Sequence, residues 1–150
     1  MMNRRPLELY IHIPFCARKC AYCDFLSFEV PERVYQDYMD KLIEEIYGQS
    51  LCFSDWSVTS IFLGGGTPSL LPPRFMEELF AVLHGCFSIE EDAEITIEAN
   101  PGTLTMEKLE VYQESGINRL SLGLQSADDQ ELRVLGRIHT FDDFLKSYQR

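Results

Sequence analysis

The sequence predicts an α/β protein with a parallel sheet, because strand-like and helix-like segments alternate four times along its 150 residues. A repeated strand–helix–strand order gives parallel strands joined by right-handed crossovers. Two architectures fit this order: an open doubly wound sheet and part of a βα barrel. The barrel is favoured because apolar residues keep to one parity of the strands and polar residues to the other, whereas strands covered on both faces are apolar throughout.

The first two strand–helix units are clearly marked. Residues 7–13 alternate as a strand does, and residues 31–48 repeat apolar side chains at helical spacing up to Gly48, where the helix is expected to stop. Residues 58–65 form the second strand, which runs into glycines. The second helix, residues 72–85, opens on two prolines and closes at a glycine.

The later units carry capping signals. Two more strands are expected, at residues 93–100 and 118–126, and three more helices, at residues 105–116, 128–136 and 141–150. Thr105 is a typical capping residue for the first of these helices, and Ser126 and Thr140 begin capping-box-like signals for the other two. A full eight-unit barrel needs roughly 250 residues. Residues 1–150 are therefore expected to be the N-terminal part of a longer core domain, holding about the first four βα units.

Polar residues gather on one parity of the strands, toward their C-terminal ends. These residues are Tyr10, His12, Thr96, Glu98, Ser121, Gly123 and Gln125. The C-terminal ends of the strands are where βα folds place their sites. We therefore expect these side chains to line a cavity.

The composition excludes several classes of function. The net charge of −11 argues against a nucleic-acid-binding protein, because phosphate binding needs clustered Lys and Arg. No apolar run is long enough to be a transmembrane segment, and the first residues lack the apolar core and cleavage site of a signal peptide. A cytoplasmic location is therefore expected, where thiols stay reduced and clustered cysteines more often bind metal or do chemistry than form bridges.

Three of the five cysteines lie close together after the first strand: Cys16, Cys20 and Cys23, in CARKCAYC. Three thiolates on one loop can ligate three irons of a [4Fe–4S] cluster and leave the fourth iron open to another ligand. A zinc site with His12 as fourth ligand, a redox pair and a disulfide are the alternatives. The other two cysteines are isolated among apolar residues and are expected to be buried packing residues: Cys52 and Cys86.

Three further motifs offer ligand contacts. Consecutive glycines at Gly64 to Gly66 let a backbone approach a ligand and point N–H groups at it. The run matches neither GxGxxG nor a Walker loop, so a carboxylate or amino-acid group is the expected occupant. Glu98 is placed to hold a cation or ribose hydroxyls, and Arg137 to reach a carboxylate. A salt-bridged surface glutamate and a solvated helix-end charge are the alternatives for these two.

Together these motifs resemble the radical S-adenosylmethionine (SAM) superfamily, whose signature is CxxxCxxC with an aromatic residue before the last cysteine. More narrowly, four stretches are similar to the group that contains oxygen-independent coproporphyrinogen III oxidase and the HemW-type haem chaperones: YIHIPFCARKCAYCDF, GGGTPSLL, EANPGTL and RLSLGLQSADDQELRVLGRIH. The resemblance runs from Leu7 to His139. It implies a partial TIM-like barrel of the radical SAM type.

The resemblance also implies cofactors and their contacts. S-adenosylmethionine would bind the open iron through its amino and carboxylate groups and be cleaved to methionine and a 5′-deoxyadenosyl radical. The implied ligands of the [4Fe–4S] cluster are Cys16, Cys20 and Cys23. The implied contacts to S-adenosylmethionine are Tyr10, Tyr22, Gly65, Gly66, Thr67, Glu98, Gln125 and Arg137. No catalytic residue beyond the cluster ligands is assigned.

Two departures favour the chaperones over the oxidases. The oxidases carry a fourth cysteine two residues after the third, where this chain has Phe25, and a longer segment before the first strand. The chaperone interpretation implies binding of haem or porphyrin, delivery of haem to haem-accepting proteins and a reducing electron donor. Coproporphyrinogen III oxidation is the enzymatic alternative, and a zinc-stabilised non-catalytic βα domain is the structural one. A homodimer and peripheral membrane contact stay open.

Overall fold

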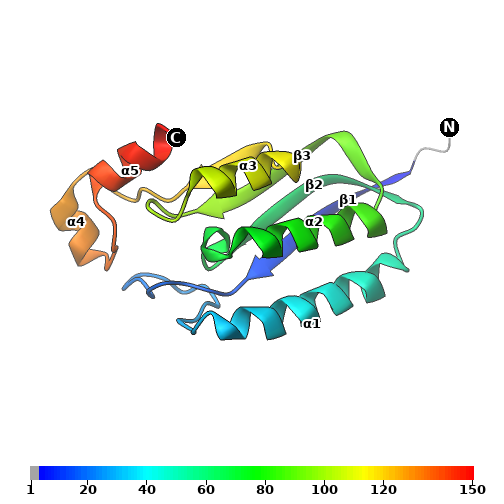
Figure 1. The fold of residues 1–150 in the computed structure, drawn as a ribbon, viewed down its shortest axis with the longest axis horizontal. Helices are drawn as coiled ribbons and strands as arrows, with labels where there is room; N and C mark the ends of the chain where they lie inside the picture. The colour runs from blue at the N-terminus through cyan, green and yellow to red at the C-terminus, as the bar shows by residue number, and fades with distance from the viewer. Residues whose placement is uncertain (1–3) are drawn as a thin grey trace.

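The computed structural model describes residues 4–150, and its centre is one sheet of four parallel strands (Figure 1). The strands are β1 (Arg5–Ile13), β2 (Trp56–Gly65), β3 (Ile89–Ala99) and β4 (Arg119–Leu122). Their order in the sheet is their order in the chain, and each pairs in parallel with the next. A doubly wound sheet reverses its strand order at a switch point. The unbroken order is that of a barrel wall, as predicted.

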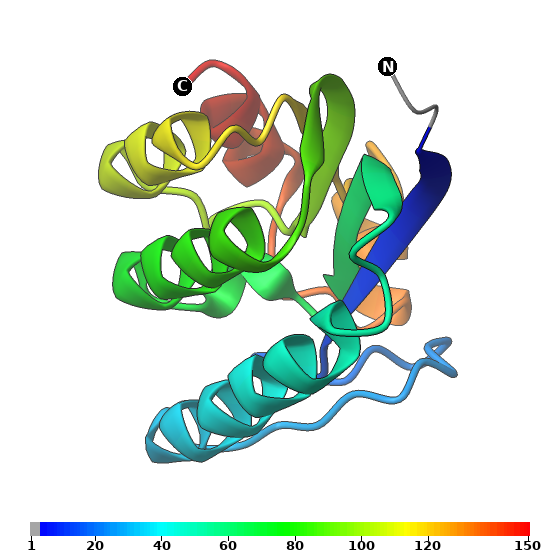
Figure 2. The same cartoon turned by 90° about the vertical axis from the view of Figure 1, so that its right-hand side faces the viewer.

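Three helices cover one face of this sheet and lie side by side (Figure 2). They are α1 (Arg33–Ser50), α2 (Pro73–Cys86) and α3 (Met106–Glu114). Two short helices lie beyond the C-terminal ends of the strands, at the left of Figure 1: α4 (Asp129–Val134) and α5 (Phe141–Tyr148). Among residues 4–150, no helix is both long and apolar enough to cross a bilayer.

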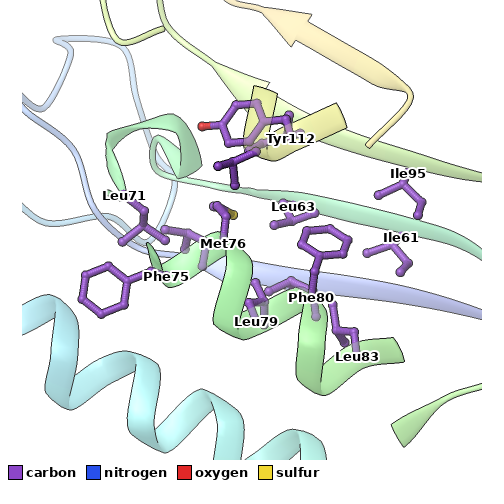
Figure 3. Packing of buried hydrophobic residues seen from close by; sticks show 14 of the residues in the cluster. Ile61, Leu63, Leu71, Phe75, Met76, Leu79, Phe80, Leu83, Ile95 and Tyr112 are labelled. Atoms are coloured by element: carbon purple, nitrogen blue, oxygen red, sulfur yellow. The ribbon is translucent and has the colours of Figure 1, made fainter. Parts of the chain in front are cut away.

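The core lies between the sheet and the helices, and α2 contributes most to it (Figure 3). Ile61 and Leu63 of β2 face Phe80 and its neighbours on α2, and all of these side chains are buried. The predicted apolar parity is thus confirmed for the first three strands. It fails at Leu120, which is 39% exposed on the edge strand β4.

The predicted helix starts are partly confirmed. Thr105 and Thr140 accept hydrogen bonds from backbone N–H groups of α3 and α5, and Thr140 forms a full capping box. The prediction for Ser126 is wrong. The N-cap of α4 is Asp128, whose carboxylate accepts two backbone N–H bonds, while the Ser126 hydroxyl donates to the side chain of Glu131.

Two predicted ends are also wrong. Helix α1 continues past Gly48 to Ser50, because a glycine inside a helix costs only about 1 kcal/mol. Strand β4 ends at Leu122, so the residues after it turn away from the sheet. Gln125 there takes a positive φ of 71°. A short 3-10 turn that was not predicted, η1 (Pro68–Leu70), follows β2.

Candidate cluster and cofactor site

A cavity of about 270 Å³ lies at the C-terminal ends of the strands. It is open to solvent on one side and is lined by the cysteine loop, the turn after β2, the end of β3 and the segment after β4. All predicted cluster and S-adenosylmethionine contacts except Tyr10 line it: Cys16, Cys20, Tyr22, Cys23, Gly65, Gly66, Thr67, Glu98, Gln125 and Arg137. Of the other polar strand residues expected at a cavity, Ser121 and Gly123 line it, but the prediction is wrong for His12 and Thr96, whose side chains bond to the Leu26 carbonyl and to Glu94 instead. Motifs up to about 120 residues apart in the sequence therefore meet in one place.

The cysteine loop is closed at its base by one parallel bridge between Phe15 and Phe28. The Cys16 N–H donates to the Phe28 carbonyl at 3.0 Å, and the Phe28 N–H donates to the Pro14 carbonyl at 2.8 Å. The Cys23 N–H donates to the Cys20 carbonyl at 3.2 Å. All five cysteines of the chain are free thiols. The backbone, not a disulfide, thus holds the three thiols at the cavity wall.

Side chains other than the three cysteines support this loop. The imidazole Nε2 of His12 donates to the Leu26 carbonyl at 2.9 Å, and its Nδ1 accepts from the Tyr10 hydroxyl at 3.2 Å. Lys19 is held twice, since its N–H donates to the Glu29 carboxylate and its Nζ donates to a loop carbonyl, both at 2.6 Å. With both ring nitrogens engaged, His12 supports the loop and is not a fourth zinc ligand. Within residues 4–150 no three His, Cys, Asp or Glu side chains are gathered as a single-ion site needs.

Two of the sulfurs contact hydrogen-bond donors. The Thr67 hydroxyl lies 3.8 Å from Cys16 Sγ, and Arg137 Nη1 donates to Cys20 Sγ at 3.4 Å. Arg137 is therefore not the solvated helix-end charge that was the alternative interpretation.

The glycine run lets the turn after β2 pack closely against the end of β1. A Cβ on Gly66 would lie 2.5 Å from the Phe15 carbonyl oxygen, and one on Gly65, where φ is +110°, would lie 2.5 Å from the His12 ring. The N–H of Gly66 donates to the Ile13 carbonyl at 2.8 Å, and the N–H of Gly65 lies 3.3 Å from Glu98 Oε2. These N–H groups already have protein partners. The glycines thus serve close packing as well as access to the cavity.

Glu98 presents a half-buried carboxylate to the cavity. Burial raises the pKa of Glu98 above that of an exposed glutamate, and the hydrogen bond from the Gly65 N–H opposes that shift. Tyr10 stands beside this carboxylate but off the cavity. Its ring stacks on Phe62 at 6.1 Å between centroids, and burial first, then the charge of Glu98, raises the pKa of Tyr10.

The residues present fit a [4Fe–4S] cluster with an open iron. Three free thiols lie on one wall of a cavity whose other walls carry a carboxylate, an amide and a guanidinium. Arg137 Nε is buried and, within the described part of the chain, has no hydrogen-bond partner. A buried donor without a partner is costly unless a ligand satisfies it.

Comparison with known proteins agrees with this geometry. The family model described as the radical SAM superfamily matches residues 10–150, and the chain belongs to that superfamily. Its sequence is 43% identical over 140 residues to the haem chaperone HemW of Escherichia coli, which covers 93% of this chain and 37% of that protein. HemW of Bacillus subtilis is 35% identical over 142 residues, which is 94% of this chain and 38% of that protein.

A solved structure shares the fold closely. The coproporphyrinogen III oxidase HemN from Escherichia coli superposes with a TM-score of 0.91 at 31% identity, over 97% of this chain and 34% of that one. The chain thus spans about a third of the length of the proteins it matches. The partial radical SAM barrel predicted from the sequence is confirmed.

The sequence analysis missed four residues that line the cavity, Arg18, Phe25, Ala99 and Asn100, and it misplaced Cys52. Asn100 lines the cavity, and its signal was available, since it lies two residues beyond Glu98 and so shares its parity. Cys52 is exposed in the turn after α1, contrary to the expected burial, whereas Cys86 is half-buried against the core.

The close packing of the glycine run predicts opposite effects on stability for two glycine substitutions. Gly65→Ala should destabilise the protein by about 1–3 kcal/mol, because any L side chain is strained at that φ and its Cβ would meet His12. Gly48→Ala, with nothing within 4 Å on the exposed side of α1, should stabilise by about 0.5–1 kcal/mol. Denaturant unfolding of both variants measures the difference. Equal stability of the Gly65 variant and the parent would contradict the packing described.

Proposed function

We propose that this chain is part of a cytoplasmic haem chaperone that carries a [4Fe–4S] cluster and S-adenosylmethionine in the cavity and delivers haem to haem-requiring proteins. The observation that carries the proposal is the single cavity in which three free thiols at CxxxCxxC spacing face Glu98, Gln125 and Arg137. Identity of 43% to a haem chaperone supports the choice within the superfamily.

Each residue has a role in this proposal. Cys16, Cys20 and Cys23 hold the cluster, which when bound supplies the electron for cleavage of S-adenosylmethionine. The contacts offered to S-adenosylmethionine are Tyr10, Tyr22, Gly65, Gly66, Thr67, Glu98, Gln125 and Arg137. Among them, Glu98 accepts hydrogen bonds from ribose hydroxyls, and Arg137 Nε donates to a carboxylate. A reducing partner protein would first pass this electron to the cluster.

A second candidate is oxidation of coproporphyrinogen III, which the superposition on HemN favours. Phe25 speaks against it. This side chain lines the cavity and is 66% exposed at the position where the oxidases place a fourth cysteine.

One assay separates the two functions. Full-length protein, reconstituted anaerobically and reduced, is given coproporphyrinogen III in one arm and haem in the other. We expect stoichiometric haem binding and transfer to a haem-free acceptor protein, with coproporphyrinogen III unchanged. Formation of protoporphyrinogen would reject the chaperone in favour of the oxidase.

The cluster ligands can be tested by composition. Cys20→Ala should abolish cluster assembly without unfolding the protein, because the loop is held by backbone bonds that this substitution leaves in place. Cys52→Ala, at an exposed cysteine outside the cavity, is the matched control and should keep full iron and sulfide. Iron and acid-labile sulfide analysis with circular dichroism gives both answers. Normal metal content in the Cys20 variant would refute its role as a ligand.

Glu98 should show opposite effects on binding and on stability. Because burial raises its pKa in the folded state, its contribution to stability is present below the unfolded-state pKa and is lost as pH rises through the folded-state pKa. At neutral pH Glu98→Gln should therefore unfold no more easily than the parent, and yet bind S-adenosylmethionine more weakly with the same cluster content. Denaturation curves, calorimetric binding and iron analysis check this, with the exposed Glu91→Gln as control. Parallel loss of cluster and S-adenosylmethionine would make Glu98 structural.

A further inference from the structure

Asn100 connects two of the cysteine sulfurs through side chains. Its Nδ2 donates to Thr67 Oγ1 at 2.8 Å, and its Oδ1 accepts from Arg137 Nη2 at 2.6 Å. Thr67 Oγ1 lies 3.8 Å from Cys16 Sγ, and Arg137 Nη1 lies 3.4 Å from Cys20 Sγ. One amide thus stands at the centre of a continuous chain of contacts between Cys16 and Cys20.

The direction of each bond in this chain is determined. Arg137 has only donors, so the oxygen of the Asn100 amide must face it and the NH₂ group must face Thr67. Because Thr67 Oγ1 accepts from the amide, its own proton is free to point at Cys16 Sγ. Because Asn100 holds Nη2, the planar guanidinium keeps Nη1 directed at Cys20 Sγ.

The surroundings leave the Asn100 side chain little freedom. Its backbone is held by Thr103, whose hydroxyl and N–H both donate to the Asn100 carbonyl, at 2.7 and 3.1 Å. Thr67, which accepts the hydrogen bond from the Asn100 amide, is itself buried, with 3% of its surface exposed. A Cβ on Gly123 would lie 2.9 Å from Asn100 Oδ1, and the Gly123 carbonyl accepts a second bond from Arg137 Nη2 at 2.9 Å. The amide is therefore fixed from several elements at once.

We infer that Asn100 is a positioning residue that directs Thr67 and Arg137 at the sulfurs of Cys16 and Cys20 and thereby raises the reduction potential of the cluster. This inference rests on the proposed function, because it needs a cluster on these cysteines. Hydrogen bonds and positive charge at the ligating sulfurs stabilise the reduced state, which carries one more negative charge.

The test uses the full-length protein, reconstituted anaerobically, with the potential measured by titration followed by electron paramagnetic resonance. Asn100→Leu removes both amide bonds without adding charge. We expect near-parental iron and sulfide and about a tenfold smaller equilibrium constant for one-electron reduction, which is about 59 mV more negative. Asn100→Asp should shift in the same direction, because a carboxylate accepts the Thr67 proton and turns it away from Cys16 Sγ. A shift in the Asp variant alone would show a simple charge effect and overturn the inference.

Asn118→Leu is the matched control. Asn118 also uses both ends of its amide, accepting from the Ile95 N–H at 2.9 Å and donating to the Ala93 carbonyl at 2.8 Å, and it does not line the cavity. This variant should lose stability and keep the parental potential. An equal potential shift here would mean that general loosening, not positioning, is the cause.

Thr67→Val keeps the inference testable if Asn100→Leu assembles poorly. It removes only the hydroxyl that faces Cys16 Sγ, so its potential should also fall, and Asn100→Leu added to it should shift the potential less than it does alone. An unchanged potential in Thr67→Val, or full additivity in the double variant, would overturn the inference. Absence of iron and sulfide from the parental protein would instead overturn the proposed function.

Discussion

The site depends on a close contact between the ends of β1 and β2. Their ladder continues past the end of β2, where the Gly66 N–H donates to the carbonyl of Ile13, the last residue of β1, at 2.8 Å. The next bond lies beyond both strands, where the Thr67 N–H donates to the Phe15 carbonyl at 2.7 Å. The contact is possible because Gly66 has no side chain, since a Cβ would lie within 3 Å of three Phe15 backbone atoms. It places Thr67 beside Cys16, so the register of two strands determines where the cysteine loop begins.

The cavity carries a charge that the fold alone does not favour. The Glu98 carboxylate is partly desolvated, and one N–H bond at 3.3 Å offsets only part of that cost. Arg137, which follows α4, is satisfied at Nη1 and Nη2 by Cys20, Asn100 and Gly123, and its Nε has no partner among the described residues. Glu98 lies at the end of β3 and Arg137 after α4, and among the described residues the two form no salt bridge, so both groups stay available to a ligand.

Much of this was predictable where a local rule decides the outcome. The alternation of strands and helices predicted the parallel sheet, the parity of the strands favoured the barrel, and the caps at Thr105 and Thr140 are local in sequence. The cysteines and Glu98 were found because their motif or strand position is itself the signal. The helix end predicted at Gly48 was wrong, because a helix packed along its length tolerates a glycine. The helix start predicted at Ser126 was wrong, because the nearby Asp128 is the N-cap of α4. The role of Asn100 was out of reach because it depends on contacts from three separate segments.

Two sets of contacts hold the cysteine loop, and they act on different atoms. The outer set, from His12, Lys19 and Glu29, binds backbone N–H and carbonyl groups, which are not the groups proposed to ligate the cluster. The inner set, from Thr67 and Arg137, contacts the sulfurs themselves. Because ordering a loop costs about 1–2 kcal/mol per residue, a loop already shaped by the outer set leaves less to be ordered on metal binding. The contacts from Thr67 and Arg137 can then act on the reduction potential of a cluster bound to those sulfurs.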